Sequence, residues 1–277
     1  MRRHRVHEVD TDDGVTLRAT VSGEGPSLVF LQGVIGDGDL DWRALVPRLA
    51  DQFTCHLPSM RGRGRSDEHP NLRIDRVGQD YADYVESLGE PVGLVGWSAG
   101  AGHALGLASR LTAVAATAAY EPMIGVLMDE DERADLRHAL TRGRDLVGQH
   151  QLAAAMRAVA AHPFTPADVE AAEHSGYFEA AGDYAPHLLQ VFQQVSDYDG
   201  PMPEDPEVLG AITSPVLVLH GSETTSLFTR GAGHVVAQVA GARRRAIPGA
   251  GHAGPLTHPI EVADELRVFF NSIETLG

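Results

Sequence analysis

The segment Gly96-Trp97-Ser98-Ala99-Gly100 has the residue pattern in this chain best suited to covalent chemistry. An apolar run, residues 92–95, precedes it, and an Ala/Gly/Leu-rich stretch typical of a helix begins near Ala99. A serine on a sharp strand-to-helix turn sits in a strained backbone that only small neighbours accommodate. The helix N-terminus behind it offers free N–H groups to a developing oxyanion. We therefore predict that Ser98 is a nucleophile; a serine capping a glycine-rich helix is the plainer alternative.

A serine hydroxyl near neutral pH needs a base within hydrogen-bond reach, and that base needs an acid to orient it. Of the fourteen histidines, His252 is the best candidate, because it ends a glycine-rich loop, Gly249-Ala250-Gly251, after the last predicted strand. We predict that His252 is the general base, with an ordinary surface histidine as the alternative. His220 lies at a strand end and is expected to be structural.

The elements that must position these residues alternate between strand and helix. Short apolar or alternating runs bounded by Gly and Pro predict strands at residues 5–9, 15–21, 27–31, 53–57, 92–95, 114–120, 216–220 and 244–247. Asp12-Asp13-Gly14 predicts a hairpin turn between the first two. Apolar residues at helical spacing separate most of the later strands. This order is typical of a doubly wound, mostly parallel α/β sheet.

Residues 122–205 show helical stripes and no strand pattern. A helical insertion inside an α/β alternation is expected to cap the ligand edge of the sheet. We therefore assign residues 1–121 and 206–277 to the core and residues 122–205 to the cap. The aromatic residues of the cap are expected mainly to pack its helices, with the lining of an apolar pocket as the alternative: Tyr177, Phe178, Tyr184, Phe192 and Tyr198.

Composition excludes several classes of function. The chain has 277 residues, 43% of them hydrophobic and 22% charged, as expected of a globular protein. Its net charge of −16 argues against nucleic acid and anionic membranes as partners. No apolar run is long enough to span a bilayer, and no secretory signal is recognised. Cys55 is the only cysteine, so no intrachain disulfide is possible. We expect a cytoplasmic enzyme that acts on a small molecule.

Metal and cofactor motifs are not found. There is no H-E-x-x-H, C-x-x-C, complete phosphate loop or dinucleotide fingerprint, so we predict neither a metal nor a cofactor. Asp37, Asp39 and Asp41 alternate along the chain, but calcium would need further ligands, including a bidentate glutamate. Asp41 is instead expected to cap a helix whose apolar stripe begins at Trp42.

Several motifs together resemble the α/β-hydrolase fold family, specifically its cap-bearing serine esterases and hydrolases. Residues 28–33 resemble the family strand that ends in His-Gly, and residues 61–67 resemble its Arg-Gly-x-Gly-x-Ser loop. Residues 249–252 resemble its histidine loop, and the likeness covers nearly the whole chain. The resemblance implies that the backbone N–H groups of Val34 and Ala99 form an oxyanion hole. It also implies a chain order of serine, acid and histidine.

The acid departs from the family pattern. The family usually places an aspartate three residues after the glycine that ends the preceding strand, and that position here is Thr224. We predict that the adjacent Glu223, whose side chain is longer, orients His252. Glu121, at the end of the previous strand, is the alternative, and a site without a direct carboxylate is the third possibility.

Two other positions depart from the pattern. Gln32 replaces the usual histidine before Gly33, and Ser59 replaces an aspartate two residues before Arg61. Both side chains can still stabilise, by hydrogen bonding, the loop that carries Val34, which we call the oxyanion loop. We name Trp97 and Gln32 as candidate substrate-binding residues.

The resulting expectation is a hydrolase that cleaves a small ester, thioester or lactone through a Ser-His-acid triad and an acyl-enzyme. Ser98 excludes the dehalogenase and epoxide-hydrolase types that need an aspartate at this position. A carbon–carbon bond hydrolase or a cofactor-free perhydrolase or lyase of the same fold is the alternative within the class. A non-catalytic small-molecule-binding protein with this fold is the alternative outside it. The sequence gives no indication of oligomeric state.

Overall fold

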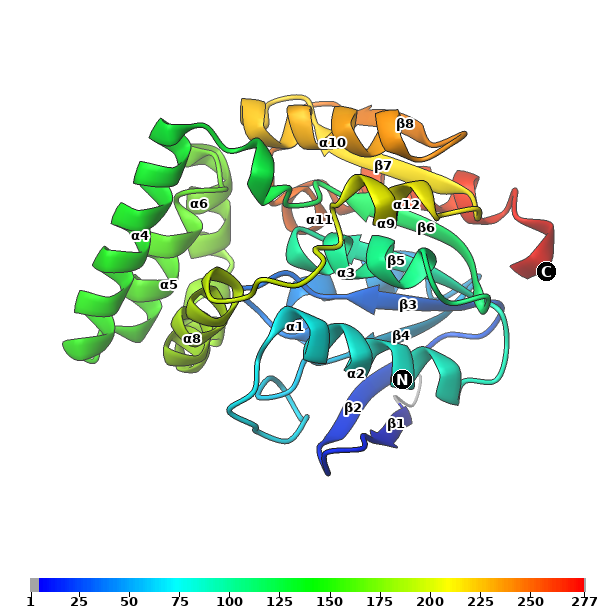
Figure 1. Cartoon of the computed structure of the whole chain (residues 1–277), viewed down its shortest axis with the longest axis horizontal. Coiled ribbons are helices and arrows are strands. Elements are labelled where there is room, and N and C mark those ends of the chain that lie inside the picture. The colour runs from blue at the N-terminus through cyan, green and yellow to red at the C-terminus, as the bar shows by residue number, and fades with distance from the viewer. Residues whose placement is uncertain (1–4, 277) are drawn as a thin grey trace.

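The computed structural model describes residues 5–276 and contains an eight-stranded sheet (Figure 1). In chain order the strands are β1 (Arg5–Asp10), β2 (Thr16–Ser22), β3 (Ser27–Leu31), β4 (Thr54–Pro58), β5 (Val92–Trp97), β6 (Val114–Tyr120), β7 (Val216–Gly221) and β8 (Arg243–Ile247). All eight strands expected from the sequence are present, with ends that differ by one or two residues.

The strands are arranged in the order β1-β2-β4-β3-β5-β6-β7-β8. β1 and β2 form the predicted antiparallel hairpin, and β2 also pairs antiparallel with β4. The remaining neighbours are parallel. Because parallel strands end at the same edge, the residues that follow β3, β5, β6 and β7 gather at one side of the molecule.

Helices cover both faces of the sheet. In β3, Leu28 and Phe30 belong to one apolar core, whereas Val29 and Leu31 belong to a second core on the opposite face. The helices packed on the first core include α1 (Gly38–Trp42) and α12 (Pro259–Phe270). Those on the second include α2 (Ile74–Ser87), α3 (Ala99–Ala108) and α10 (Ser226–Gln238). This confirms the expected doubly wound, mostly parallel architecture.

The segment around Trp42 differs from the expected helix. α1 ends at Trp42, and a separate 3-10 turn covers Val46–Arg48, with Pro47 in its first turn. Proline lacks the N–H that would continue an α-helix, which explains the break. The N-cap of α1 is Asp37, whose carboxylate accepts from the Leu40 N–H at 2.8 Å. The expectation that Asp41 caps this helix is therefore wrong.

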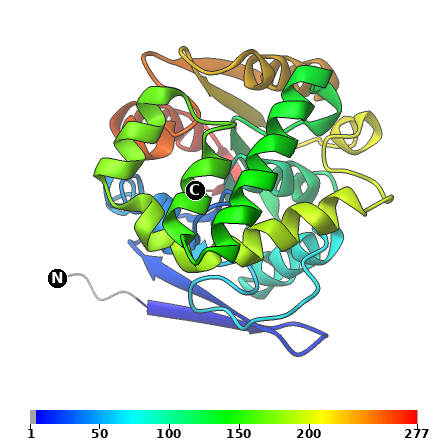
Figure 2. The ribbon, with the colours of Figure 1, turned by 90° about the vertical axis from the view of Figure 1, so that its left-hand side faces the viewer.

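The chain between β6 and β7 is helical. Its α-helices are α4 (Glu130–Gly148), α5 (Leu152–Ala160), α6 (Pro166–His174), α7 (Tyr177–Ala181), α8 (Ala185–Ser196) and α9 (Pro206–Gly210). α4, α5, α6 and α8 lie at one end of the sheet in Figure 1 and stand in front of the molecule in Figure 2. α6 contacts α11 (Gly254–Thr257), and α7 contacts α1. The division into core and cap stays a prediction, and residues 1–4 and 277 of the core lie outside the described residues.

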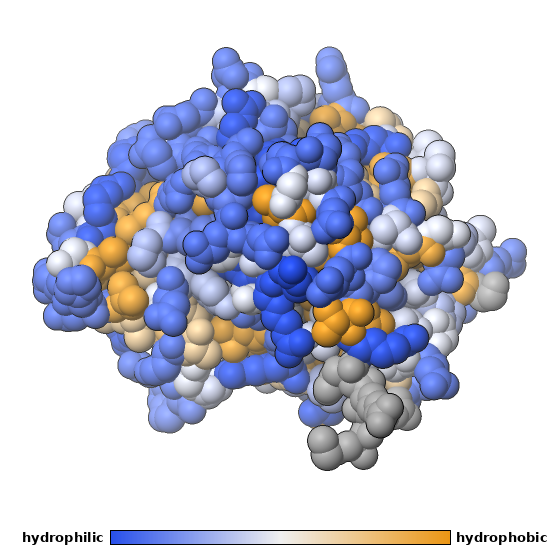
Figure 3. Space-filling view, turned by 90° about the horizontal axis from the view of Figure 1, so that it is seen from below, coloured by the Kyte–Doolittle hydropathy of each residue, from blue (hydrophilic) through white to orange (hydrophobic). Residues whose placement is uncertain are grey.

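Much of the face shown in Figure 3 is hydrophilic, with apolar residues in separate patches. The large apolar side chains that are exposed, Val6, Val126, Ile260 and Val268, come from different parts of the chain. Among residues 5–276, no helix is both long enough and apolar enough to cross a membrane.

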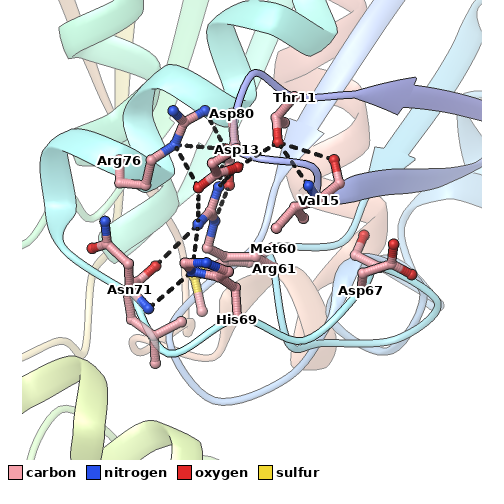
Figure 4. A network of polar contacts seen from close by, with 12 residues as sticks. Thr11, Asp13, Val15, Met60, Arg61, Asp67, His69, Asn71, Arg76 and Asp80 are labelled. Carbon is pink, nitrogen blue, oxygen red and sulfur yellow. Dashed lines mark hydrogen bonds and ion pairs between the residues drawn. The ribbon is translucent and has the colours of Figure 1, made fainter.

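A buried ionic network fixes the loop that follows β4 (Figure 4). The Arg61 side chain is 0% exposed and donates to Asp80 of α2 at 2.6 and 2.8 Å. It also donates to Asp13, in the β1–β2 turn, at 2.9 Å. These hydrogen bonds hold the pKa of Asp13 well below its usual range. Asp80 accepts further hydrogen bonds from Arg76. The network thus joins a turn, a helix and the loop that carries Arg63.

Replacing Arg61 tests the strength of this network. Arg61→Met leaves two carboxylates without their main partner, so we expect the free energy of unfolding to fall by about 3–5 kcal/mol in urea titrations. Arg157→Met is the control, because Arg157 and its partner Glu173 are 51% and 52% exposed. We expect that change to cost less than about 1 kcal/mol. Equal losses in the two variants would contradict the assignment.

Candidate active site

Ser98 lies on a strained turn between β5 and α3. Its φ and ψ angles are 57° and −116°, a conformation that non-glycine residues rarely adopt. A Cβ on Gly96 would come within 2.4 Å of the Gly100 carbonyl oxygen, and one on Gly100 within 2.2 Å of the Leu31 oxygen. Both glycines are therefore required sterically, as the sequence pattern predicted.

The backbone turns at Glu121, directly after β6, in the same way that it turns at Ser98, directly after β5. Trp97 and Tyr120 are paired in register, and the residue after each has a positive φ, 57° for Ser98 and 46° for Glu121. The Ser98 N–H donates to the Tyr120 carbonyl at 3.0 Å, which extends the strand pairing to the turn. Ser98 and Glu121 therefore leave the sheet at the same level on adjacent strands.

His252 is held by its backbone and by aromatic neighbours. Its carbonyl accepts a hydrogen bond from Trp97 Nε1 at 2.8 Å, and the preceding Gly251 carbonyl accepts from the Tyr120 hydroxyl at 2.7 Å. Its ring stacks on Phe228 with a centroid separation of 3.9 Å. These contacts attach the histidine loop to β5, β6 and α10. As a result, His252 and Ser98 line the same cavity although they are far apart in sequence.

The carboxylate that contacts the His252 ring is Glu121. Its Oε2 lies 2.7 Å from His252 Nδ1, and its side chain is 0% exposed. Oε2 also accepts from the Thr224 hydroxyl at 2.8 Å, and Oε1 accepts from the Gly221 N–H at 2.7 Å. An imidazole Nδ1 next to a buried carboxylate carries the proton, which leaves Nε2 free to act as a base.

The structure corrects the choice of Glu223. That side chain is exposed, and its Oε1 accepts a hydrogen bond from Ser222 rather than from a histidine. The residue at the usual family position, Thr224, turns inward and donates to Glu121. The side chain of Glu121 therefore meets His252 from β6, and the hydroxyl of Thr224 stabilises it.

The loop after β3 carries the first predicted oxyanion donor. The N–H of Gly33 donates to Asp41 at 2.7 Å, whereas no group in residues 5–276 accepts from the N–H of the next residue, Val34. Val34 lines the cavity beside Ser98. Ala99 is the first residue of α3, so its N–H has no intrahelical acceptor. Both amides are available to a ligand.

Gln32 and Ser59 brace this loop. The Gln32 amide donates to the Gly36 carbonyl at 2.8 Å and accepts from the Met60 N–H at 2.9 Å. Ser59 Oγ accepts from the Gly38 N–H at 3.3 Å. Because both ends of the Gln32 amide are engaged and Gln32 does not line the cavity, its selection as a substrate-binding residue is corrected to a bracing role. Trp97, the other candidate, does line the cavity.

The cavity over Ser98 is small and mainly apolar. Its lining residues are Gly33, Val34, Ile35, Trp97, Ser98, Pro163, Phe164, Tyr177 and His252. Its volume is ≈ 20 Å³, which accommodates about one water molecule. Of the cap aromatics singled out in the sequence, only Tyr177 lines it. Phe164 was missed because nothing in its sequence context marks it. No group of three or more His, Cys, Asp or Glu in the described residues could hold a metal ion.

A glycine substitution tests the turn at Ser98. Gly100→Ala places a Cβ against the backbone oxygens of β3, so we expect a loss of about 3 kcal/mol or more in unfolding free energy, measured by urea titration. Gly148→Ala is the control, because nothing lies within 4 Å of the added Cβ at the end of α4. That change should be neutral or stabilise by up to about 1 kcal/mol. A neutral Gly100→Ala would contradict the geometry of the turn.

Comparison with solved structures supports the same architecture. An alpha/beta hydrolase from Sphaerobacter thermophilus superposes with a TM-score of 0.75 over 95% of this chain and 100% of its own, at 23% identity. The enol-lactonase from Burkholderia xenovorans gives a TM-score of 0.77 over 96% of this chain and 100% of its own, at 17% identity. At these identities the likeness establishes the fold.

Sequence comparison establishes the family. A pimeloyl-[acyl-carrier protein] methyl ester esterase from Stenotrophomonas maltophilia is 38% identical over 95 residues, which are 34% of this chain and 35% of that protein. The matched region thus spans about a third of the length of this curated relative. Residues 28–265 match the family model described as "Alpha/beta hydrolase family". Since these residues make up most of this chain, the chain belongs to the α/β-hydrolase family.

Proposed function

We propose that this protein is a serine hydrolase that cleaves a small ester, thioester or lactone. Ser98 is the nucleophile, His252 the general base and Glu121 the acid that orients the base. The observation that carries the proposal is the 2.7 Å hydrogen bond between buried Glu121 and His252, together with the cavity that His252 and Ser98 both line. A charged carboxylate is retained in such a buried place where its hydrogen bonds are satisfied, as they are here by three donors.

The reaction proceeds in two steps. Ser98 Oγ forms a bond to the carbonyl carbon as its proton passes to His252 Nε2, and the carbonyl oxygen becomes an oxyanion. The N–H groups of Val34 and Ala99 stabilise that charge, by about 3 kcal/mol for each donor in comparable sites. Cleavage of the bond to the leaving group transfers the proton from His252 to it. Water, deprotonated by His252, then attacks the acyl carbon, and the bond to Ser98 Oγ breaks as His252 returns that proton to it, which releases the carboxylic acid.

The relatives are consistent with this chemistry. The Stenotrophomonas protein is named as a methyl ester esterase, and the Burkholderia structure as an enol-lactonase. Both names describe attack on an ester-type carbonyl. The similarity to the esterase is local, so the substrate assignment depends on the site itself. The intact Glu121–His252 contact argues against the non-catalytic alternative, in which the site would be degraded.

Removal of the nucleophile tests the proposal. We expect Ser98→Ala to lower kcat for p-nitrophenyl acetate by about 10⁴-fold or more, and to abolish labelling by a fluorophosphonate. Ser109→Ala, at the other end of α3, is the control and should keep both properties. Undiminished turnover or labelling in Ser98→Ala would remove the serine mechanism.

Substitutions of the two candidate glutamates are expected to affect kcat differently. Glu121→Gln keeps the shape of the side chain but removes the charge that stabilises protonated His252, so kcat should fall by about 10³–10⁴-fold. Glu223→Gln changes an exposed side chain and should alter kcat by less than about twofold. Steady-state kinetics with thermal melting as a check on folding measure both. A large loss in Glu223→Gln and none in Glu121→Gln would restore the original choice.

A further inference from the structure

Arg63 is buried beneath the loop that carries Val34, and no carboxylate among residues 5–276 accepts a hydrogen bond from it. The residue is 1% exposed. Its guanidinium donates to three successive backbone carbonyls, those of Val34 at 3.0 Å, Ile35 at 2.6 Å and Gly36 at 2.9 Å. Burial lowers the pKa of Arg63 to about 10, so it remains charged at neutral pH. Burying a cation without a hydrogen-bonded carboxylate is costly, and here three of the hydrogen bonds that offset this cost hold one loop.

Asp41 holds the preceding peptide. It is 0% exposed and accepts from the Gly33 N–H at 2.7 Å and from the Tyr177 hydroxyl at 2.7 Å. Burial raises the pKa of Asp41 to about 7, with hydrogen bonds from Tyr177 and Gly33 and the charge of Arg63 opposing that rise. The carboxylate lies so close to the loop that a Cβ on Gly36 would come within 1.9 Å of its Oδ1.

These contacts determine how Val34 is oriented. Asp41 accepts from the Gly33 N–H, and Arg63 donates to the Val34 carbonyl. These two hydrogen bonds fix the peptide units on either side of the Gly33–Val34 unit. The Gly33–Val34 unit between them carries the N–H that has no acceptor in the described part of the chain. A rigid donor requires no reorganisation when charge develops, which is the basis of oxyanion stabilisation.

The helices between β6 and β7 hold this arrangement together. Tyr177 of α7 donates to Asp41, and its side chain also lines the cavity over Ser98. His187 of α8 accepts from Arg63 Nε at 3.0 Å through Nδ1. The ring of His187 lies over Gly62, where a Cβ would come within 2.3 Å of Nε2. Any displacement of α7 and α8 from the sheet would break both contacts.

We propose that Arg63 and Asp41 are positioning residues that set the oxyanion-stabilising N–H of Val34, and that Tyr177 and His187 couple this setting to the docking of the overlying helices. The inference rests on the proposed serine-hydrolase function. It goes beyond that function because it makes the oxyanion hole dependent on the cap. The Val34 N–H is held in its orientation only while α7 and α8 remain packed against the oxyanion loop and Arg63. A merely structural role for Arg63 would alter stability without changing the reaction at the active site.

Kinetics of Arg63→Met and Arg63→Lys test the positioning role. With active sites counted by complete fluorophosphonate labelling, we expect kcat to fall by about 10- to 100-fold in both variants, with KM changed by less than about threefold. Affinity for a trifluoromethyl ketone, whose adduct carries an oxyanion, should fall by the same factor as kcat/KM. Arg137→Met is the matched control, because Arg137 pairs with Glu130 within α4 and the two side chains are 62% and 77% exposed. It should leave both quantities unchanged.

Hydrogen exchange provides a test that does not depend on activity. In Arg63→Met and Tyr177→Phe, peptides covering residues 32–38 should exchange their amide hydrogens about tenfold faster or more, whereas Arg137→Met should leave them unchanged. Unchanged exchange, or unchanged kcat and inhibitor affinity in an active enzyme, would overturn the inference while the serine mechanism stands. If the wild type lacks Ser98-dependent turnover, the proposed function fails. The exchange result then decides alone whether the loop is held as inferred.

Discussion

The hydrogen bond between Glu121 and His252 is the contact on which the organisation of this site depends. It joins the end of β6 to the loop after β8, and the same carboxylate holds the end of β7 through the Gly221 N–H and Thr224. A buried carboxylate left without these donors would cost several kcal/mol. The sheet edge, the histidine loop and the orientation of the imidazole are therefore fixed together. Displacement of one strand end would disturb all three.

Backbone strain marks the same edge. Ser98 and Glu121 both adopt positive φ angles directly after paired residues of adjacent strands. Each such conformation costs of order 1–3 kcal/mol and persists only where the surroundings impose it. For Ser98 the surroundings are close backbone contacts at Gly96 and Gly100 and the continued pairing with Tyr120. For Glu121 they include pairing of its N–H with the Leu219 carbonyl at 2.9 Å. Because Trp97 and Tyr120 are paired in register, the two turns take both side chains out of the strand alternation at the same level of the sheet edge.

The local sequence pattern predicted the fold and the tight turn at Ser98 because both depend on short-range information. Strands that are buried on both faces lack charged residues and are mostly apolar, as β3 and β5 are. A turn with two close backbone approaches requires glycine at fixed spacing. The acid could not be chosen this way. Glu223 and Glu121 both follow strands, and the family position led to the wrong one. The useful signal was the glutamate directly after the residue 114–120 strand, in the same place relative to its strand as Ser98.

The charged residues under the oxyanion loop were harder still to predict. The sequence around Asp41 predicts a helix cap, and Arg63 occupies a variable position of the Arg-Gly-x-Gly-x-Ser motif. Their partners Tyr177 and His187 are more than a hundred residues away. Only the packing of α7 and α8 brings these groups together, and no local pattern encodes it. The cavity over Ser98 has space for about one water molecule, so binding of a larger molecule requires the lining residues to rearrange.

A crystal structure of the protein after reaction with a small alkyl fluorophosphonate would test the central claim most directly. The account predicts phosphorus bonded to Ser98 Oγ and a phosphonyl oxygen about 2.7–3.1 Å from the backbone nitrogens of Val34 and Ala99, with Glu121 still bonded to His252. Attachment to a different residue, or an adduct on Ser98 whose oxygen points away from both amides, would contradict it.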